Sequence, residues 1–281
     1  MSIADPEVKA WASQSVVTRR PARTRVRLRD LIGYRPVIYA VAIRDLKTRY
    51  KQSVLGPAWT VFQPLGLLIA FSIGFNAVAH VNTGGVPYYL FALTGLAVWT
   101  YFQAVLMAGT GSIVNNFALV RWTPCPRLAL PLAALVSNLP SFVVPALAAL
   151  IAAIVTGHVW VGWLLIPVLT VWLLLLVAAF TVALSVITVR ARDVLSALPF
   201  LLSVVVFLAP VAYSTANLSA PLRALVAINP LTGLIEAWRW SLLDLTPSWR
   251  AVGLSGALTI IGLVFAWRLF ARLEPIMADE I

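Results

Sequence analysis

The chain is organised by long runs of residues without a charged side chain. No Asp, Glu, Lys or Arg occurs in residues 52–120, 128–189, 194–222 or 251–267. A membrane-spanning helix needs about 20 consecutive apolar residues, so the first two runs can hold two helices each and the others one each. Polar breaks such as AHVNTGGVP and TGHVWVG divide the longer runs. The pattern therefore predicts six spans, at residues 59–78, 88–109, 128–155, 164–189, 194–213 and 251–270.

Within these runs, apolar residues do not alternate with polar ones. A membrane β-barrel would show alternation in segments of about ten residues, and stretches such as LTVWLLLLVAAFTVALSVI show none. Helices and closed barrels are the two structures that satisfy every backbone group in lipid. We therefore expect an all-α integral membrane protein with a six-span domain at residues 57–270.

Composition and charge set the expected orientation. Hydrophobic residues make up 61% of the chain and charged residues 11%, against roughly 25% charged residues in soluble domains. Six spans put both ends on one side, and 18 of the 21 Lys and Arg residues fall on that side. Positive residues stay in the cytoplasm. The basic tail at residues 1–36 and the C-terminal tail at 271–281 are therefore predicted to be cytoplasmic.

The N-terminal tail and Cys125 indicate neither a signal peptide nor a disulfide. The Arg-rich start is not expected to be a signal peptide, because the first apolar run begins too far along the chain. Cys125 is alone, so no disulfide within the chain is possible.

A basic segment runs directly into the first span. Residues 37–56 are predicted to form an amphipathic helix at the interface, because apolar residues fall on one arc and basic ones opposite. Asp45 and Arg49 are spaced to form an ion pair, Gly56 is expected to end the helix, and Pro57 suits the first turn of the next. Two interpretations stay open: a solvated flank, or a docking surface for a cytosolic partner. The apolar arc holds Ile38, Tyr39, Ala42, Ile43, Leu46, Tyr50 and Val54, and the basic side holds Arg44, Lys47 and Lys51.

The segment before the last span, NPLTGLIEAWRWSLL, predicts another short helix. Asn229 can cap it, Pro230 fits its first turn, and Glu236 and Arg239 are spaced to pair on one face. The helix is interpreted either as dipping into the outer leaflet as a gate or as lying at the interface, anchored by Trp side chains. Its apolar face is formed by Leu234, Ile235, Trp238 and Leu242.

The sequence lacks several motifs of nucleotide binding and catalysis. It has no phosphate loop, because no glycine is followed by Lys, and it contains neither H-E-x-x-H nor G-x-S-x-G. No catalytic residue, metal site or enzymatic activity is expected. The predicted spans also lack the buried charge that usually couples a transporter to protons or sodium. Energy is thus expected from another protein.

Aromatic residues in the first two spans allow two interpretations. They could line a path along which the apolar faces of sugar rings slide, or they could pack in the core. Polar residues in the spans, such as Asn138 beside Pro140, are interpreted as helix-to-helix hydrogen bonds or as partners of carbonyls freed by proline. The candidate pathway residues are Phe62, Phe71, Trp99, Tyr101 and Phe102.

Five segments, in order, carry a resemblance to a known family: RDLKTRYKQSVLGPAW, YYLFALTGLAVWTYF, CPRLALPLAALVSNL, LAPVAYS and INPLTGLIEAWRWSLL. Across about residues 36 to 243, the chain resembles the permease subunits of ABC exporters for O-antigen, capsule and teichoic acid. The resemblance implies a homodimer in the bacterial inner membrane, bound to two copies of a separate ATP-binding subunit that holds ATP and Mg²⁺. The implied substrate is a lipid-linked glycan, surrounded by membrane lipids, and no nucleic acid is expected.

The resemblance also assigns roles to residues. Residues 38–55 become the interface helix, residues 116–127 a coupling helix inserted into the ATPase, and residues 229–243 re-entrant helices on the outer side. Cys125 and the residue after Tyr213 depart from the usual pattern and leave the polymer open. The coupling candidates are Phe117, Val120, Arg121, Trp122, Pro126, Arg127, Arg44, Lys47 and Lys51. The outer-gate candidates are Tyr213, Asn229, Pro230, Glu236 and Arg239.

Two other functions remain compatible with the sequence. One is an ABC permease for a smaller lipid or drug, and the other is a lipid scramblase that needs no energy source.

Overall fold

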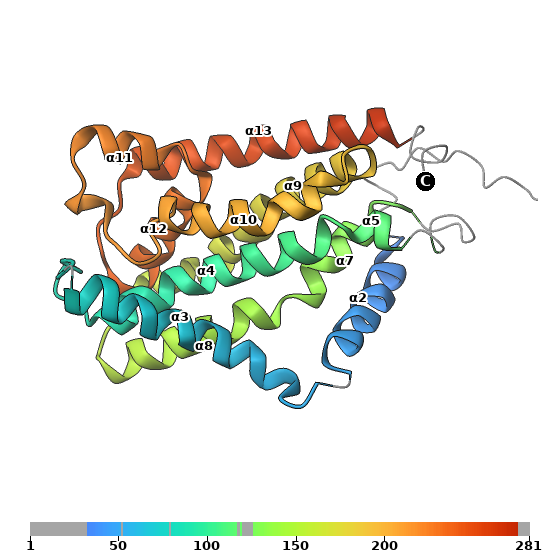
Figure 1. Ribbon diagram of the computed structural model, residues 1–281. Helices are drawn as coiled ribbons and strands as arrows, with labels where there is room; N and C mark the ends of the chain where they lie inside the picture. The colour runs from blue at the N-terminus through green and yellow to red at the C-terminus, as the bar shows by residue number, and fades with distance from the viewer. Residues whose placement is uncertain (1–32, 52, 79, 117–118, 120–125, 275–281) are drawn as a thin grey trace, which may run out of the picture.

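The structure, a computed structural model, describes residues 33–51, 53–78, 80–116, 119 and 126–274. The described residues form helices and no strands (Figure 1). The helices of the first half are α2 (Arg35–Tyr50), α3 (Trp59–Phe71), α4 (Tyr88–Gly109), α5 (Ser112–Asn115), α7 (Ala129–Ser137) and α8 (Pro140–Val155). Those of the second half are α9 (Ile166–Arg190), α10 (Asp193–Leu208), α11 (Ala220–Ala227), α12 (Pro230–Leu243) and α13 (Trp249–Leu273).

Five segments are long and apolar enough to cross a membrane, and they coincide with five of the six predicted spans. Short tight helices extend two of them, Gly56–Ala58 before α3 and Val161–Leu165 before α9. A π-helical turn, Ser72–Val78, continues α3. The candidate spans are Gly56–Ala77, Tyr88–Gly109, Ala129–Val155, Val161–Arg190 and Trp249–Leu273.

The predicted fifth span is shorter than expected. Its helix, α10, has 16 residues and ends at Leu208 rather than Tyr213. Ala209 adopts an extended conformation, with ψ 136°, because the ring of Pro210 disfavours a helical residue before it. At about 1.5 Å per residue, α10 is shorter than the hydrocarbon core of a bilayer, so the six-span prediction is confirmed for five spans only.

The third span is broken into α7 and α8. Asn138 has φ −98° and ψ 2°, outside the helical range, and Pro140 starts the second helix. Pro140 has no N–H to donate to the carbonyl of Val136, so this carbonyl accepts from Leu139 at 3.2 Å instead. The prolines thus produce a sharp break, which Figure 1 shows between the two helices.

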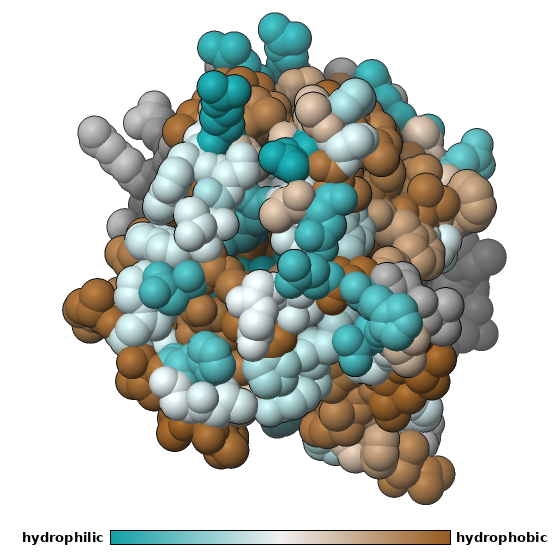
Figure 2. All heavy atoms as spheres, turned by 90° about the vertical axis from the view of Figure 1, so that its left-hand side faces the viewer, coloured by the Kyte–Doolittle hydropathy of each residue, from teal (hydrophilic) through white to brown (hydrophobic). Residues whose placement is uncertain are grey.

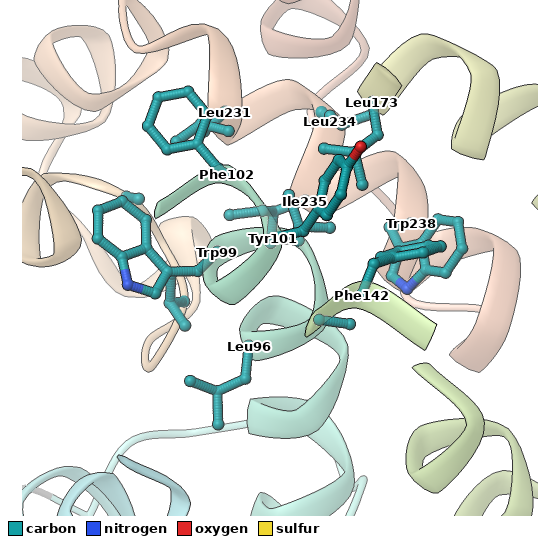
Figure 3. Close-up of a cluster of buried hydrophobic side chains, with 14 of the residues drawn as sticks. Leu96, Trp99, Tyr101, Phe102, Phe142, Leu173, Leu231, Leu234, Ile235 and Trp238 are labelled. Carbon is teal, nitrogen blue, oxygen red and sulfur yellow. The ribbon is translucent and has the colours of Figure 1, made fainter. Parts of the chain in front are cut away.

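The core is built around α4. In the apolar stretch of α4, 83% of the residues are buried, against 17% in the span that contains α3, so α4 is central and α3 peripheral. Figure 3 shows aromatic and aliphatic side chains of α4, α8, α9 and α12 meeting in this core. Its members with almost no exposed surface include Leu96, Trp99, Tyr101, Leu173, Leu231, Leu234, Ile235 and Trp238.

The two ends of the helix bundle differ. At one end, called here the α2 end, α2 packs against α7, and α9 and α13 have their last turns at the same end (Figure 1). The opposite end, called the α12 end, carries α11, α12 and the connection between α3 and α4. Figure 2 looks onto the α12 end, where hydrophilic residues lie along the top and in the middle of the face and hydrophobic ones mainly at its sides and lower edge.

The helix predicted at residues 37–56 is present but ends earlier. α2 stops at Tyr50, and Gly56 begins the next helical segment instead of ending this one. Gly56 has φ +46°, a left-handed conformation that favours glycine, and it forms the elbow before α3. Val54 lies outside the helix and is fully exposed, so its predicted place on the apolar arc was wrong.

The bundle covers only part of α2. Val41 and Ala42 are buried against the bundle, whereas Tyr39 is 62% exposed. The predicted pair of Asp45 with Arg49 does not form. Asp45 pairs with Arg44 at 2.7 Å, and Arg49 turns toward α7.

Candidate functional site

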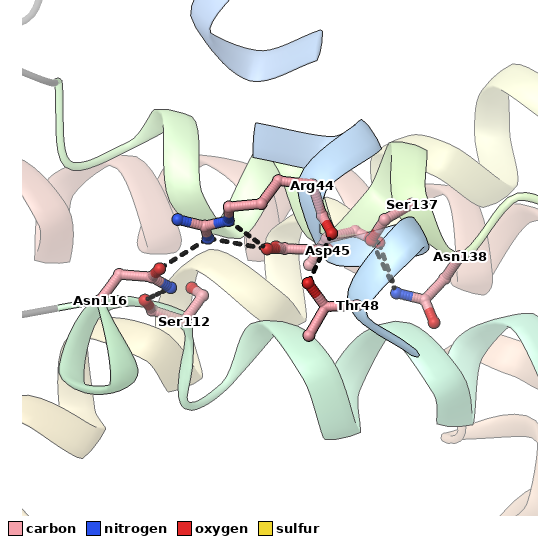
Figure 4. Close-up of polar contacts among 8 residues, drawn as sticks. Arg44, Asp45, Thr48, Ser112, Asn116, Ser137 and Asn138 are labelled. Carbon is pink, nitrogen blue, oxygen red and sulfur yellow. Dashed lines mark hydrogen bonds and ion pairs between the residues drawn. The ribbon is translucent and has the colours of Figure 1, made fainter. Parts of the chain in front are cut away.

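The first polar network lies at the α2 end and joins α2 to the rest of the chain (Figure 4). Arg44 donates to the Asp45 carboxylate at 2.7 and 2.9 Å and to Oδ1 of Asn116 at 2.6 Å. The Asn116 amide in turn donates to the carbonyl of Ser112, at the start of α5. Arg44 therefore ties α2 to the first residue of the candidate coupling loop.

The coupling candidates have different positions. Phe117, Val120, Arg121 and Trp122 lie outside the described residues. Pro126 is buried, and Arg127 donates from its guanidinium to the carbonyl of Glu274, just after α13. Lys47 of α2 and Lys51, which directly follows this helix, are exposed. The loop is thus held at its start by α2 and at its end by the chain after α13.

The second polar network surrounds the α7–α8 break. Asn138 is fully buried, and its Nδ2 donates to the carbonyl of Ala134 at 2.7 Å. The Ala134 carbonyl also accepts its regular helical bond from the Asn138 N–H at 3.2 Å, so Asn138 does not pair with a carbonyl freed by the proline, which one of the two interpretations predicted. Its Oδ1 accepts a hydrogen bond from Arg49 of α2, the residue whose spacing predicts a pair with Asp45.

Helix α4 supplies donors to the same break. Tyr101 donates from its hydroxyl to the carbonyl of Leu135 at 3.0 Å, because the N–H of Leu139 points elsewhere. Thr100 donates to the carbonyl of Ser141 at 2.8 Å, since the helical partner of this carbonyl would be Pro145, which has no N–H. No feature of the sequence pointed to Thr100.

The third polar cluster lies at the α12 end and contains the outer-gate candidates. Arg239 is 4% exposed, and its guanidinium donates to the carbonyls of Val211 at 2.6 Å and Tyr213 at 3.3 Å. Its carbon Cζ lies 3.6 Å from the centroid of the Phe91 ring. Gly95 of α4 leaves the space for this group, because a Cβ there would lie 2.9 Å from Nη2 of Arg239.

Glu236 and Arg239 do not form the predicted ion pair. Glu236 is 7% exposed and accepts from the Ser248 N–H at 2.8 Å and from the Thr215 hydroxyl. Each charged residue therefore binds a different part of the chain around α12. Neither faces solvent, because α12 is buried on almost every side.

The remaining outer candidates attach α12 to the segment that follows α10. Asn229 caps α12, accepting from the Leu231 N–H at 3.0 Å, and donates to the carbonyl of Leu208 at 3.3 Å. Pro230 occupies the first turn, as predicted. Tyr213 stacks on Phe75 with ring centroids 6.4 Å apart. We call Asn229, Glu236 and Arg239, with the chain segment 208–215 that they bind, the outer clamp.

Trp238 lies in the core and not at an interface. It is 1% exposed, and its ring contacts Phe142 with centroids 5.4 Å apart. The interpretation of this helix as a surface helix anchored by Trp side chains is therefore wrong for Trp238.

The candidate pathway aromatics divide into two groups. Trp99, Tyr101, Phe102 and Phe71 are each 7% exposed or less, inside the core of this chain. Phe62 is 52% exposed on α3. Of the five, Phe62 alone presents a half-exposed ring on the surface of a single chain.

The model of the ABC-2 type transporter family matches residues 36–243. The chain belongs to this family. The matched part runs from the start of α2 to the end of α12, so it includes the α7–α8 break and the outer clamp. Members of the family are transport subunits rather than catalytic ones.

Three relatives are similar along most of their length. The O-antigen export system permease protein RfbA of Myxococcus xanthus is 29% identical over 216 residues, which cover 75% of this chain and 82% of that protein. A protein of the same name from Klebsiella pneumoniae is 24% identical over 250 residues, 86% of this chain and 95% of that protein. The polysialic acid transport protein KpsM of Escherichia coli is 23% identical over 247 residues, 85% of this chain and 94% of that protein.

Proposed function

We propose that the chain is the membrane subunit of an ATP-driven exporter that moves a lipid-linked polysaccharide across the bacterial inner membrane. The observation that carries this proposal is its similarity, over nearly their whole length, to permeases named for the export of O-antigen and polysialic acid. A polymer related to capsule, O-antigen or teichoic acid is the proposed substrate.

A separate ATP-binding subunit is proposed to supply the energy and to hold ATP and Mg²⁺. This chain has no phosphate loop of its own. An exposed basic surface is formed by Arg44 and Lys47 of α2 and by Lys51, which directly follows it, and the ends of the 116–127 loop lie at the same end of the bundle. These groups are the proposed contacts of two ATPase copies, with both chain ends in the cytoplasm.

The polysaccharide is proposed to pass between two copies of the chain. In the part of the chain that the structure describes, packed side chains fill the interior around α4 and leave no room for a hydrated sugar chain. Large apolar side chains are exposed on the peripheral helices α3 and α10, and these helices are the proposed lining and dimer contact. They include Phe62, Leu65 and Ile69 of α3 and Phe200, Leu201 and Phe207 of α10.

The outer clamp is proposed to act as the outer gate, and α11 and α12 as re-entrant helices. In support of this, the clamp binds the end of α10, one of the two proposed lining helices. Movement of α10 would therefore require these hydrogen bonds to shift.

The test is transport by purified protein. The chain and its ATPase subunit are reconstituted in vesicles, and transfer of a labelled lipid-linked glycan is followed with and without ATP. We expect transfer only with ATP and only with the ATPase present. Transfer without ATP would support a scramblase instead, and ATP-driven transfer of the lipid but not the glycan would support a permease for smaller substrates.

A second measurement tests the coupling surface. The double change Arg121→Glu with Trp122→Ala should abolish copurification of the ATPase while leaving the permease in the membrane. Survival of the complex would show that the 116–127 loop does not hold the ATPase.

A further inference from the structure

The last turn of α2 makes polar contacts with two different spans. Arg49 donates to Oδ1 of Asn138 in the α7–α8 break. The next residue, Tyr50, shares a hydrogen bond of 2.7 Å with Thr60 in the first turn of α3. One turn earlier, Arg44 binds Asn116 at the start of the 116–127 loop. A single short helix therefore contacts the loop, the first span and the break in the third span.

The contact with Asn138 differs from ordinary surface pairing. Asn138 is 0% exposed, and its Nδ2 is already used within the break, by the carbonyl of Ala134 at 2.7 Å and the Ser137 hydroxyl at 3.3 Å. Oδ1 is left for a donor from outside α7 and α8, and Arg49 provides it. A charged donor on a buried acceptor makes a stronger hydrogen bond than a neutral one.

The break is a place where the backbone lacks its regular bonds. Neither Pro140 nor Pro145 has an N–H, so the carbonyls of Val136 and Ser141 cannot make their helical bonds. Thr100 and Tyr101 of α4 compensate on the two sides of the break, at Ser141 and Leu135. Between these two fixed points, the side chain of Asn138 is bound by α2.

We propose that Arg49 is a positioning residue that transmits movement of α2 to the α7–α8 break through Asn138. The inference rests on the proposed function, because it requires an ATPase that moves α2. It adds a specific route by which a displacement at the membrane surface reaches the inside of the third span. Arg49 is exposed, as are the basic residues assigned to ATPase contact, but its guanidinium donates to Asn138 at the end of α7.

The test compares export with ATP hydrolysis in the assembled complex. Arg49→Gln and Asn138→Leu each remove the contact, and the amount of glycan exported per ATP hydrolysed should fall by at least about tenfold, as expected for loss of a hydrogen bond to a charged group. Combining the two changes should lower this ratio no further, because both remove the same contact. A merely structural role would lower the amount of complex but leave the ratio unchanged.

Two conservative changes and one control complete the design. Asn138→Asp keeps an oxygen acceptor for Arg49 but loses the amide donor to the Ala134 carbonyl, and Arg49→Lys keeps a cationic donor, so each should retain part of the ratio. Arg35→Gln removes an exposed arginine from the first turn of the same helix and should match the wild type.

The possible outcomes separate this inference from the proposed function. If wild-type and Arg35→Gln complexes hydrolyse ATP without exporting glycan, the proposed function fails. If the wild-type and Arg35→Gln complexes export glycan, and Arg49→Gln exports as much glycan per ATP hydrolysed, the inference alone is overturned. The inference is also overturned if the two changes lower the glycan exported per ATP additively in the double variant. If no variant at Arg49 or Asn138 forms a complex, the contact is needed for folding, and the inference is overturned as well.

Discussion

The guanidinium of Arg239 in α12 lies over the ring of Phe91 in α4, with Cζ 3.6 Å from the ring centroid. A cation on an aromatic face is stabilised by the ring quadrupole, and more strongly when water is excluded. The described residues give Arg239 no carboxylate partner within ion-pair distance, and its other contacts are neutral oxygens, mainly backbone carbonyls. The charge of Arg239 is therefore stabilised by α4, through the ring and polar atoms, and by the carbonyls of the chain after α10.

Replacing Arg239 should loosen the outer clamp. Arg239→Gln removes the cation and leaves the buried carbonyls of Val211 and Tyr213 without their donor, which should cost about 2 kcal/mol or more. Thermal unfolding in detergent micelles measures this loss. Arg223→Gln is the matched control, because Arg223 also donates to backbone carbonyls but is exposed, so water can replace it. Equal losses in the two variants would contradict the assignment of a buried clamp.

A second prediction concerns the glycine that makes room for this cation. In Gly95→Ala, the added Cβ would lie 2.8 Å from the carbonyl oxygen of Val211 and 2.9 Å from Nη2 of Arg239. Overpacking of this kind should destabilise the protein by about 1–3 kcal/mol. The control is Gly253→Ala in α13, where nothing lies within 4 Å of the new Cβ. It should leave the unfolding temperature unchanged or slightly higher, and a similar fall in both variants would contradict the explanation.

The sequence predicted most of the fold because lipid restricts the possibilities. A long apolar run must be a helix or part of a barrel, so five spans and the capped helix at Asn229 could be located from residue patterns alone. The short α10 was missed because hydropathy continues past Leu208, while a local backbone effect at Pro210 ends the helix. Apolar periodicity detects burial but not where a proline stops a helix within an apolar run.

The polar contacts were harder to predict. Asp45 and Arg49 have the spacing of an ion pair, yet Arg49 binds Asn138, 89 positions away. Glu236 and Arg239 have a similar spacing and also bind other partners. Local spacing gives the possible partners on one helix, whereas a buried acceptor on another helix competes for the same cation. That competition depends on packing, which one sequence does not reveal.

The aromatic residues of the first two spans should separate into pathway and core by their response to truncation. Phe102→Ala should lower the free energy of unfolding by about 3–5 kcal/mol, because Phe102 is 4% exposed and packs against Phe180 with ring centroids 5.6 Å apart. Phe62→Ala should cost less than about 1 kcal/mol, since Phe62 is half exposed. Glycan export at equal protein levels should fall for Phe62→Ala. Normal export by this variant would remove Phe62 from the pathway.

The hydroxyl of Tyr101 should be needed for the α7–α8 break rather than for contact with sugar. Tyr101 is 0% exposed and its hydroxyl donates to the carbonyl of Leu135 at 3.0 Å, where the helix has lost its regular donor. Tyr101→Phe keeps the ring and leaves this buried carbonyl unpaired, so the free energy of unfolding should fall by about 1–3 kcal/mol. Tyr89→Phe, on the same helix but with a side chain 44% exposed, should change it by less than about 0.5 kcal/mol. Backbone hydrogen exchange on either side of Asn138 should also become faster in Tyr101→Phe but not in Tyr89→Phe. If unfolding and exchange match the wild type while export falls, the hydroxyl contacts substrate, and the core interpretation of Tyr101 is wrong.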